Sequence, residues 1–424
     1  MQIYKYPEAN TWNELLKRPV MDTSALEQKV TAILRDVKEN GDAAVRKYAE
    51  QFDKLAAPSF EVGPADFEAA EAALEPALKA AIRQAAKNIT TFHSAQQSIP
   101  EVIETMPGVQ CWRKSVAIEK VGLYIPGGSA PLFSTILMLG IPAKIAGCKE
   151  IILCTPSLHP AILYTAKLVG ISRVFTIGGV QAVGAMAYGT ATVPQVYKIF
   201  GPGNQYVTCA KQLVNKDGLA IDMPAGPSEV AVLADESCVP DFVAADLLSQ
   251  AEHGPDSQVV LVTTSEKVIN DVQAALDAQL ALLPRKDIAT GALANSRMIL
   301  VDNLSTAMAM LNAYAPEHLI LACEAAMDVA GMVTNAGSVF IGNYTPESAG
   351  DYASGTNHTL PTNGYAKAYS GVSLDSFVKK ITFQQISPDG LTQIGATIEA
   401  MAAAEGLDAH KQAVSVRLKQ INNR

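Results

Sequence analysis

The chain has 424 residues, with 33 Lys and Arg against 42 Asp and Glu and a formal net charge of −9. This acidic balance argues against a general nucleic-acid or anionic-membrane surface, because phosphate groups are bound by clustered basic residues. The length predicts two or three domains with a large buried core. Small polar substrates fit the acidic balance better. The six cysteines form no CxxC pair or other short-spaced framework, which indicates reduced thiols in a cytoplasmic enzyme.

The N-terminal part is expected to be helical, and the segment after it only imitates a membrane span. Apolar residues recur at helical spacing within residues 25–100. Residues 121–143 carry no charge, but Pro126, Pro131 and Pro142 interrupt the run more than a lipid-exposed helix tolerates. We therefore predict a strand, a glycine turn and a buried helix in this segment.

Two series of strands alternating with helices follow. The first series of predicted strands is Val121–Ile125, Ile151–Cys154, Val174–Ile177 and Val196–Phe200. The second series is Val230–Leu233, Val259–Val262, Met298–Val301, Leu319–Leu321 and Ser338–Ile341, with helices near 240–253, 266–282 and 305–314. This alternation is typical of parallel sheets covered on both faces, so we predict an α/β fold with two similar domains. After Pro388 two amphipathic helices remain, and they are expected to pack on another surface, such as a second subunit.

Three glycine turns follow strands of the first series, at 125–129, 178–182 and 201–206. Turns at the carboxyl ends of neighbouring parallel strands line one crevice, where Gln181 and Asn204 could read the hydroxyl or amide edges of a ligand. The G-x-G-x-x-G dinucleotide pattern is missing, and its nearest approach has a tyrosine at the third glycine position. From this pattern alone, a nucleotide site and plain strand–helix turns are equally well supported.

Gln250 and His253 stand three positions apart at the end of a predicted helix, which would place both side chains on one face. They suggest a metal site or a proton-transfer site, whereas the alternative is that His253 only donates to the last carbonyls of its helix. Asp351 could add an anionic oxygen, and His410 near the C-terminus could complete a shell of four ligands. Such a set of nitrogen and oxygen ligands suits Zn²⁺, although glutamine is a less usual ligand.

Other polar residues point to proton transfer and substrate binding. Glu317 and His318 follow a proline at an expected helix-to-strand junction, and histidine is the natural proton acceptor at neutral pH. A surface pair without a role is about as well supported by these two residues alone. Ser228 either contacts substrate or caps a turn, and the local sequence favours the cap. The segment 347–358, which ends at His358, has the density of hydrogen-bonding side chains typical of functional loops.

Together these segments resemble the histidinol dehydrogenase family over nearly the whole chain. The motifs that carry the resemblance are Gly122–Gly128, Phe200–Asn204, Ile221–Glu229, Ser249–Pro255, Ala315–Leu319 and Ser348–His358. As an ordered set these motifs are very specific. We assign no role to Asn363–Tyr369, which matches no motif of this set.

The resemblance implies a set of ligands, contacts and domains. Zinc would be bound by Gln250, His253, Asp351 and His410, with His410 supplied by the other subunit of an intertwined homodimer. NAD would be contacted by Tyr124, Gln181 and Asn204, and the substrate by Ser228, His318, His358 and Glu405 together with the metal ligands. Two incomplete Rossmann-like parallel-sheet domains are implied, at 25–123 with 230–372 and at 124–229, with small helical extensions at 1–24 and 373–424.

The reaction implied by the resemblance is an NAD-dependent four-electron oxidation of L-histidinol to L-histidine through bound L-histidinaldehyde, the last step of histidine biosynthesis. His318 would act as the general base, Glu317 would activate water for the aldehyde step, and zinc would orient the substrate. Two rival interpretations remain open. A zinc hydrolase would use the same ligands without NAD, and a non-catalytic metal-binding dimer would make Glu317 and His318 dispensable.

Overall fold

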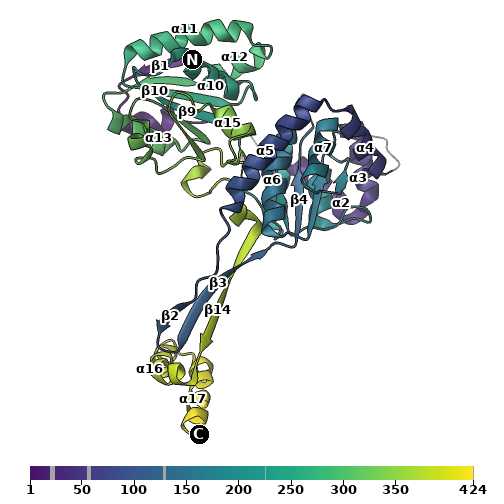
Figure 1. Cartoon of the computed structure of the whole chain (residues 1–424), viewed down its shortest axis with the longest axis vertical. Coiled ribbons are helices and arrows are strands. Elements are labelled where there is room, and N and C mark those ends of the chain that lie inside the picture. Colours follow the sequence, from purple (N-terminus) through teal and green to yellow (C-terminus); the bar gives the residue numbers. More distant parts are fainter. Residues whose placement is uncertain (20–23, 55–58, 128–129, 225, 424) are drawn as a thin grey trace. The chain divides into compact units, whose positions relative to one another are not determined.

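The structure, a computed structural model, describes residues 1–19, 24–54, 59–127, 130–224 and 226–423. The chain divides into two compact units (Figure 1), which are Met1–Gln96 with Ile118–Phe377 and Gln97–Ala117 with Val378–Arg424. The first unit contains two parallel sheets, and the second contains a three-stranded antiparallel sheet. Gly128 and Ser129 of the first glycine turn and Ala225 of the motif Ile221–Glu229 lie outside the described residues.

The larger parallel sheet is built from the second predicted series of strands. In order across the sheet its strands are β1 (Gln2–Lys5), β11 (Arg297–Leu300), β10 (Gln258–Thr263), β9 (Glu229–Ala234), β12 (His318–Ala322) and β13 (Ser338–Ile341). The predicted strands of this series are confirmed. Val230 and Val232 face one core while Ala231 and Leu233 face the other, so β9 is apolar throughout because both of its faces are covered.

Helices cover both faces of this sheet. One core is completed by α10 (Pro240–Ala251), α11 (Glu266–Leu282) and α12 (Lys286–Ala294). The opposite core is completed by α1 (Trp12–Leu15), α13 (Leu304–Tyr314) and α14 (Ala326–Ala330). A short helix, α15 (Glu347–Tyr352), follows β13 and carries two acidic side chains of the candidate site.

The smaller parallel sheet corresponds to the first predicted series. Its order is β6 (Arg173–Phe175), β5 (Glu150–Cys154), β4 (Lys120–Tyr124), β7 (Lys198–Phe200) and β8 (Ala220–Ile221). One core includes residues of α4 (Pro64–Ala73), α5 (Pro76–Ser94), α6 (Phe133–Ala146) and α7 (Pro160–Leu168). The other includes α2 (Ser24–Asn40), α3 (Asp42–Tyr48), the π-helix η2 (Ala49–Asp53), α8 (Gly179–Tyr188) and α9 (Gln205–Lys216). Two parallel sheets with helices on both faces confirm the predicted α/β class.

The second unit joins two segments that are far apart in the chain. Its antiparallel sheet has the order β14 (Val378–Ile386), β3 (Val109–Ala117) and β2 (Ile103–Met106), and it is followed by α16 (Pro388–Ala404) and α17 (Asp408–Asn422). The two terminal helices agree with the sequence prediction. The sheet that precedes them was not predicted, because β3 and β14 pair across a sequence separation that no local pattern reveals.

The predicted domain grouping needs correction in three places. Residues 25–123 were grouped with 230–372, but α2, α3, α4 and α5 share their cores with the smaller sheet, whose strand β4 lies beside α6 in Figure 1. The segment 1–24 is not a separate extension, because β1 adds an edge strand to the larger sheet. The segment 373–424 is only partly helical, since β14 pairs with β3.

The uncharged stretch 121–143 forms most of β4 and the buried part of α6, as predicted. Among the described residues, no helix is both long enough and apolar enough to cross a membrane. All six cysteines are free thiols, and five of them are buried. Burial raises the pKa of Cys148 to about 11, so this thiol is a poor nucleophile at neutral pH.

Candidate functional site

A large cavity opens at the carboxyl ends of the strands of the smaller sheet. Its volume is about 1180 Å³, and its lining includes Tyr124 after β4, Pro156 after β5, Gly179 after β6 and Asn204 after β7. The chain reverses its direction of progress across this sheet between β4 and β7, which is the usual place for a ligand in an open parallel sheet. The prediction that the glycine turns line one crevice is confirmed for their described residues.

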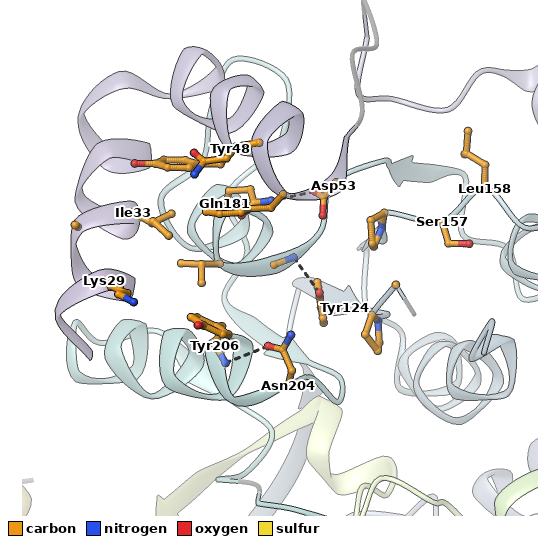
Figure 2. Close-up of a pocket in the computed structure, with 18 residues that line it drawn as sticks. Lys29, Ile33, Tyr48, Asp53, Tyr124, Ser157, Leu158, Gln181, Asn204 and Tyr206 are labelled. Atoms are coloured by element: carbon orange, nitrogen blue, oxygen red, sulfur yellow. Dashed lines mark hydrogen bonds between the residues drawn. The ribbon is translucent and has the colours of Figure 1, made fainter. Parts of the chain in front are cut away.

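The first turns of the two helices beside this cavity are already bonded within the protein (Figure 2). Gln181 Nε2 donates to Asp53 Oδ2 over 3.0 Å, and Gly179 N donates to the Tyr124 hydroxyl over 3.0 Å. Gly178 N also donates to Asp53 Oδ2 over 3.0 Å. At the next helix, Asn204 Oδ1 accepts from the backbone of Tyr206 and Val207. These donors are therefore not free to cradle a pyrophosphate, which agrees with the missing glycine fingerprint.

A second group of polar side chains gathers at the amino end of strands in the larger sheet. The register pairs Val230 with His318, so Ser228 and His318 leave β9 and β12 at the same end. The strand β12 begins at His318, directly after Glu317, and the preceding helix α13 ends at Tyr314. The predicted helix-to-strand junction is thus confirmed.

Glu317 and His318 are tied to the backbone of Glu229. Glu317 Oε2 accepts from Glu229 N over 2.9 Å, and His318 Nδ1 lies 3.1 Å from Glu229 O and 2.8 Å from Gln250 Nε2. The other ring nitrogen of His318, Nε2, lies 3.6 Å from Asp351 Oδ1, which is longer than a hydrogen bond. Gln250, His318, Glu317 and Asp351 are therefore brought together as predicted, with His318 between the two carboxylates.

The carboxylates and His318 change one another's affinity for protons. Burial raises the pKa of Glu317 to about 7 and that of Glu347 to about 8. Burial alone would lower the pKa of His318, but the negative charges of Glu317 and Glu347 outweigh this effect and raise it to about 10. Asp351 responds in the opposite direction, because the attraction of His318 lowers its pKa against the effect of burial. The group has an excess of acidic residues and so favours a bound cation.

A possible metal site lies within this group. Ligand atoms of His253, Glu347 and Asp351 all lie within 4.8 Å of one another. Gln250 Oε1 and Glu347 Oε1 are buried, and neither has a hydrogen-bond partner among the described residues. Helix α10 ends at Ala251, so His253 stands in the turn after the helix rather than on its face as predicted.

Glu347 is a site residue that the sequence prediction missed. Its side chain is buried, and its helix places it one turn before Asp351. Residues four apart in a helix lie on the same face. The sequence could have indicated this residue, because two acids stand four positions apart within the polar segment 347–358. This spacing predicts a second carboxylate beside Asp351.

His358 is held on both sides by the protein. Its Nδ1 donates to Asp351 O over 2.8 Å, because a carbonyl can only accept, and its Nε2 then accepts from the Thr135 hydroxyl over 3.0 Å. Burial lowers the pKa of His358, which keeps the ring neutral. Both ring nitrogens are thus occupied, so His358 orients the Asp351 segment in this structure.

Glu405 and His410 belong to the second compact unit. Glu405 follows the last turn of α16, and His410 lies in the first turn of α17. Both side chains are exposed within the single chain. Their predicted roles in substrate and metal binding therefore remain predictions.

A buried ion pair supports the backbone of Glu229. Arg18 Nε donates to Glu229 Oε1 over 2.5 Å and Arg18 Nη2 to Glu229 Oε2 over 2.7 Å, while the guanidinium lies 4.0 Å from the centre of the Tyr314 ring. Asn363 N also donates to Glu229 Oε1 over 2.6 Å. The segment Asn363–Tyr369, which had no predicted role, thus begins with a contact that helps to fix Glu229.

Replacing Arg18 with Met is expected to lower the free energy of unfolding by about 3–5 kcal/mol, because the Glu229 carboxylate would remain buried without its partner. Denaturant unfolding followed by circular dichroism measures the change. Lys17→Met removes a neighbouring exposed positive charge and should cost less than about 1 kcal/mol. Equal losses in the two variants would show that the Arg18 pair does not support the fold.

The chain is similar to known proteins over nearly its whole length. A family model described as histidinol dehydrogenase matches residues 16–418. A histidinol dehydrogenase of Bacteroides fragilis is 62% identical over 426 residues, which cover 99% of this chain and 100% of that protein. The enzyme of that name from Salmonella typhimurium is 51% identical over 411 residues, covering 96% of this chain and 95% of its own. The crystal structure of histidinol dehydrogenase from Elizabethkingia anophelis matches with a TM-score of 0.98 and 55% identity, over 100% of this chain and 99% of that one.

Proposed function

The chain belongs to the histidinol dehydrogenase family and is an oxidoreductase of histidine biosynthesis, and from this we propose that it oxidises L-histidinol to L-histidine in two NAD-dependent steps. L-Histidinaldehyde would stay bound between the steps. The observation that carries the proposal is the pairing of a basic histidine, His318, with buried carboxylates beside candidate metal ligands.

The residues of the site fit a divalent cation such as zinc. Gln250 Oε1 is buried without a partner, and His253 and Asp351 offer one nitrogen and one carboxylate oxygen close together. We propose that these three residues hold zinc together with His410 of the partner subunit. When bound, zinc would orient the imidazole and amine of the substrate and offset negative charge.

We assign the general base to His318. Two neighbours compete for Nδ1: Gln250 Nε2 can only donate to it, whereas Glu229 O can only accept from it. When Nδ1 carries the proton and donates to Glu229 O, the Nε2 lone pair is free. This nitrogen has no hydrogen-bond partner among the described residues, so it can take the hydroxyl proton of the substrate.

Glu317 is proposed to activate the water that adds to the aldehyde. Its Oε2 is engaged by Glu229 N and lies 3.7 Å from His318 Nδ1. The second carboxylate oxygen is then the atom that can accept a proton from water. A pKa raised to about 7 suits a group that must take up and release a proton near neutral pH.

NAD⁺ is proposed to bind in the cavity of the smaller sheet, where it would accept a hydride in each oxidation. Tyr124, Gln181 and Asn204 line this cavity, and Figure 2 shows all three side chains at its wall. Ser228, at the entry to β9, and Glu405 are proposed to contact the substrate. These assignments extend the family resemblance to named side chains.

A homodimer with shared sites is proposed from the composition of the second unit. Large apolar side chains are exposed there, including Ile99 at 92%, Met401 at 63% and Val416 at 46%. A small unit with so few buried apolar residues gains stability by packing on a partner. The six free thiols support a cytoplasmic location.

The test is the number of moles of NADH formed for each mole of L-histidinol consumed by the zinc-loaded protein. Two are expected, because both oxidations would occur before release. A matched sample stripped of metal by a chelator should lose activity and regain it on addition of zinc. One NADH would indicate an ordinary alcohol dehydrogenase, and none would favour a zinc hydrolase or a metal-binding dimer.

A further inference from the structure

Asp53 is an acidic residue of the cavity wall that the proposed reaction does not use. It ends the π-helix η2, a rare element that often marks functional positions. Among the described residues that line the cavity, Lys29 and Asp53 carry charged side chains, and Figure 2 shows them at different places on the wall. The part of the cavity wall around Asp53 is therefore negatively charged when its carboxyl group is ionised.

The bonds of Asp53 leave one oxygen available. Gly178 N and Gln181 Nε2 both donate to Oδ2, and no further described donor reaches Oδ1. A Cβ on Gly178 would lie 2.7 Å from Oδ1, so the glycine allows the carboxylate to approach the start of α8 closely. Burial raises the pKa of Asp53, and an additional hydrogen bond from a ligand would relieve that cost.

Gln181 gives a second, independent sign of a ligand. Its side chain is 1% exposed and lines the cavity, yet Oε1 has no hydrogen-bond partner among the described residues. An unpaired buried amide oxygen is unfavourable, and a hydrogen bond from a ligand would relieve this cost. Together with Asp53 Oδ1 it forms a pair of acceptors, and such a pair matches hydroxyl donors rather than a phosphate.

The neighbouring wall suits a flat aromatic base. Tyr48 and Phe52 stack with ring centres 5.8 Å apart and an angle of 5°, and Ile33 lies on the same wall. Phe52 is 53% exposed, so part of its ring remains uncovered. Phe52 and Asp53 both line the cavity, so a base held against the Phe52 ring can present its sugar to the carboxylate.

We propose that Asp53 accepts a hydrogen bond from the 2′-hydroxyl of the adenosine ribose and makes the chain select NAD over NADP. An acid at this position accepts from the hydroxyl, whereas the 2′-phosphate of NADP would meet a like charge. The N–H groups of Gly178 and Gly179 cannot compensate, since Asp53 and Tyr124 already accept from them. The inference rests on the proposed use of NAD and adds the residue that decides between the two nucleotides.

The experiment measures dissociation constants of NAD, NADP and 2′-deoxy-NAD by calorimetry, for the full-length protein and its Asp53→Asn variant. Asparagine keeps one oxygen that can accept from Gly178 N and Gln181 Nε2, but it replaces the other, charged oxygen with an NH2 group that cannot accept from the ribose hydroxyl. Asp66→Asn is the matched control, because Asp66 accepts from Gly63 N at the start of α4 and is exposed. Thermal melting of both variants shows whether the fold survives.

The unaltered protein should bind NADP at least about a hundredfold more weakly than NAD, and Asp53→Asn should narrow this gap by about tenfold or more. It should also lose the preference for NAD over 2′-deoxy-NAD, while Asp66→Asn keeps both preferences. An unchanged NADP-to-NAD ratio in Asp53→Asn overturns the inference, as does failure of the unaltered protein to bind either nucleotide. Binding that follows the expected pattern without histidinol oxidation would instead refute the proposed function alone.

Discussion

Replacing His318 with Asn should lower the rate of both oxidations by about 10²–10⁴-fold, the usual contribution of a positioned general base. The value of kcat should fall for L-histidinol and for L-histidinaldehyde alike. In each oxidation a base must accept the proton of a hydroxyl group on the carbon that loses the hydride, first in the alcohol and then in the hydrated aldehyde. The side-chain amide of asparagine can still donate a hydrogen bond to Glu229 O, so we expect the fold to persist. Single-turnover formation of NADH with each substrate measures the two losses separately.

His159→Asn is a suitable control for loss of an imidazole. His159 is exposed and caps α7 through its Nδ1, a role that asparagine also fills well. This variant should retain the rate of both steps. A His318→Asn enzyme that keeps either oxidation within about threefold of the original rate would remove His318 from that step.

The charge around His318 links the base to the cation. The negative charges of the Glu317 and Glu347 carboxylates raise the pKa of His318 to about 10, which favours the protonated ring. Its contribution to folding stability is then complete below its ordinary pKa of about 6.5 and is lost as the pH rises through about 10. A cation bound among the carboxylates would offset their charge and lower this pKa, which favours the neutral ring that a base requires.

Much of the candidate site could be predicted because its residues lie in distinctive local patterns. Glu317 and His318 follow a proline at a strand start, and the structure brings them to Gln250 and Asp351. The carboxyl-end crevice of the smaller sheet followed from parallel βα units, whose turns must meet at one edge. Local sequence was thus sufficient to predict the crevice, because the geometry of parallel βα units brings their turns to one edge of the sheet.

The parts that were missed depend on contacts between distant segments. The pairing of β3 with β14 has no local signal, and the packing of α2–α5 on the smaller sheet depends on which apolar faces meet in three dimensions. Asp53 reaches the start of α8 from a π-helix more than a hundred residues earlier in the chain. Such residues become visible only when the fold places them beside the ligand cavity.

Replacing Glu317 with Gln should separate the two oxidations. The amide keeps the shape and can still accept from Glu229 N, but it cannot take a proton from water. We expect the oxidation of L-histidinaldehyde to fall by about 10²-fold or more and the oxidation of L-histidinol by less than about tenfold. Loss of the negative charge also lowers the pKa of His318, so the acidic limb of the alcohol step should move to lower pH.

The position of Glu317 makes this a demanding test. Its Oε2 lies 3.7 Å from Nδ1 of His318, whereas the proposed proton acceptor is Nε2 on the other side of the ring. A carboxylate in this place could therefore act on water directly or only through the histidine. Equal losses in the two half-reactions would mean that Glu317 acts through His318, whereas a selective loss of aldehyde oxidation would assign it to water. The ratio of the two half-reaction rates decides between them, because loss of the Glu317 charge shifts the pKa of His318 in both cases.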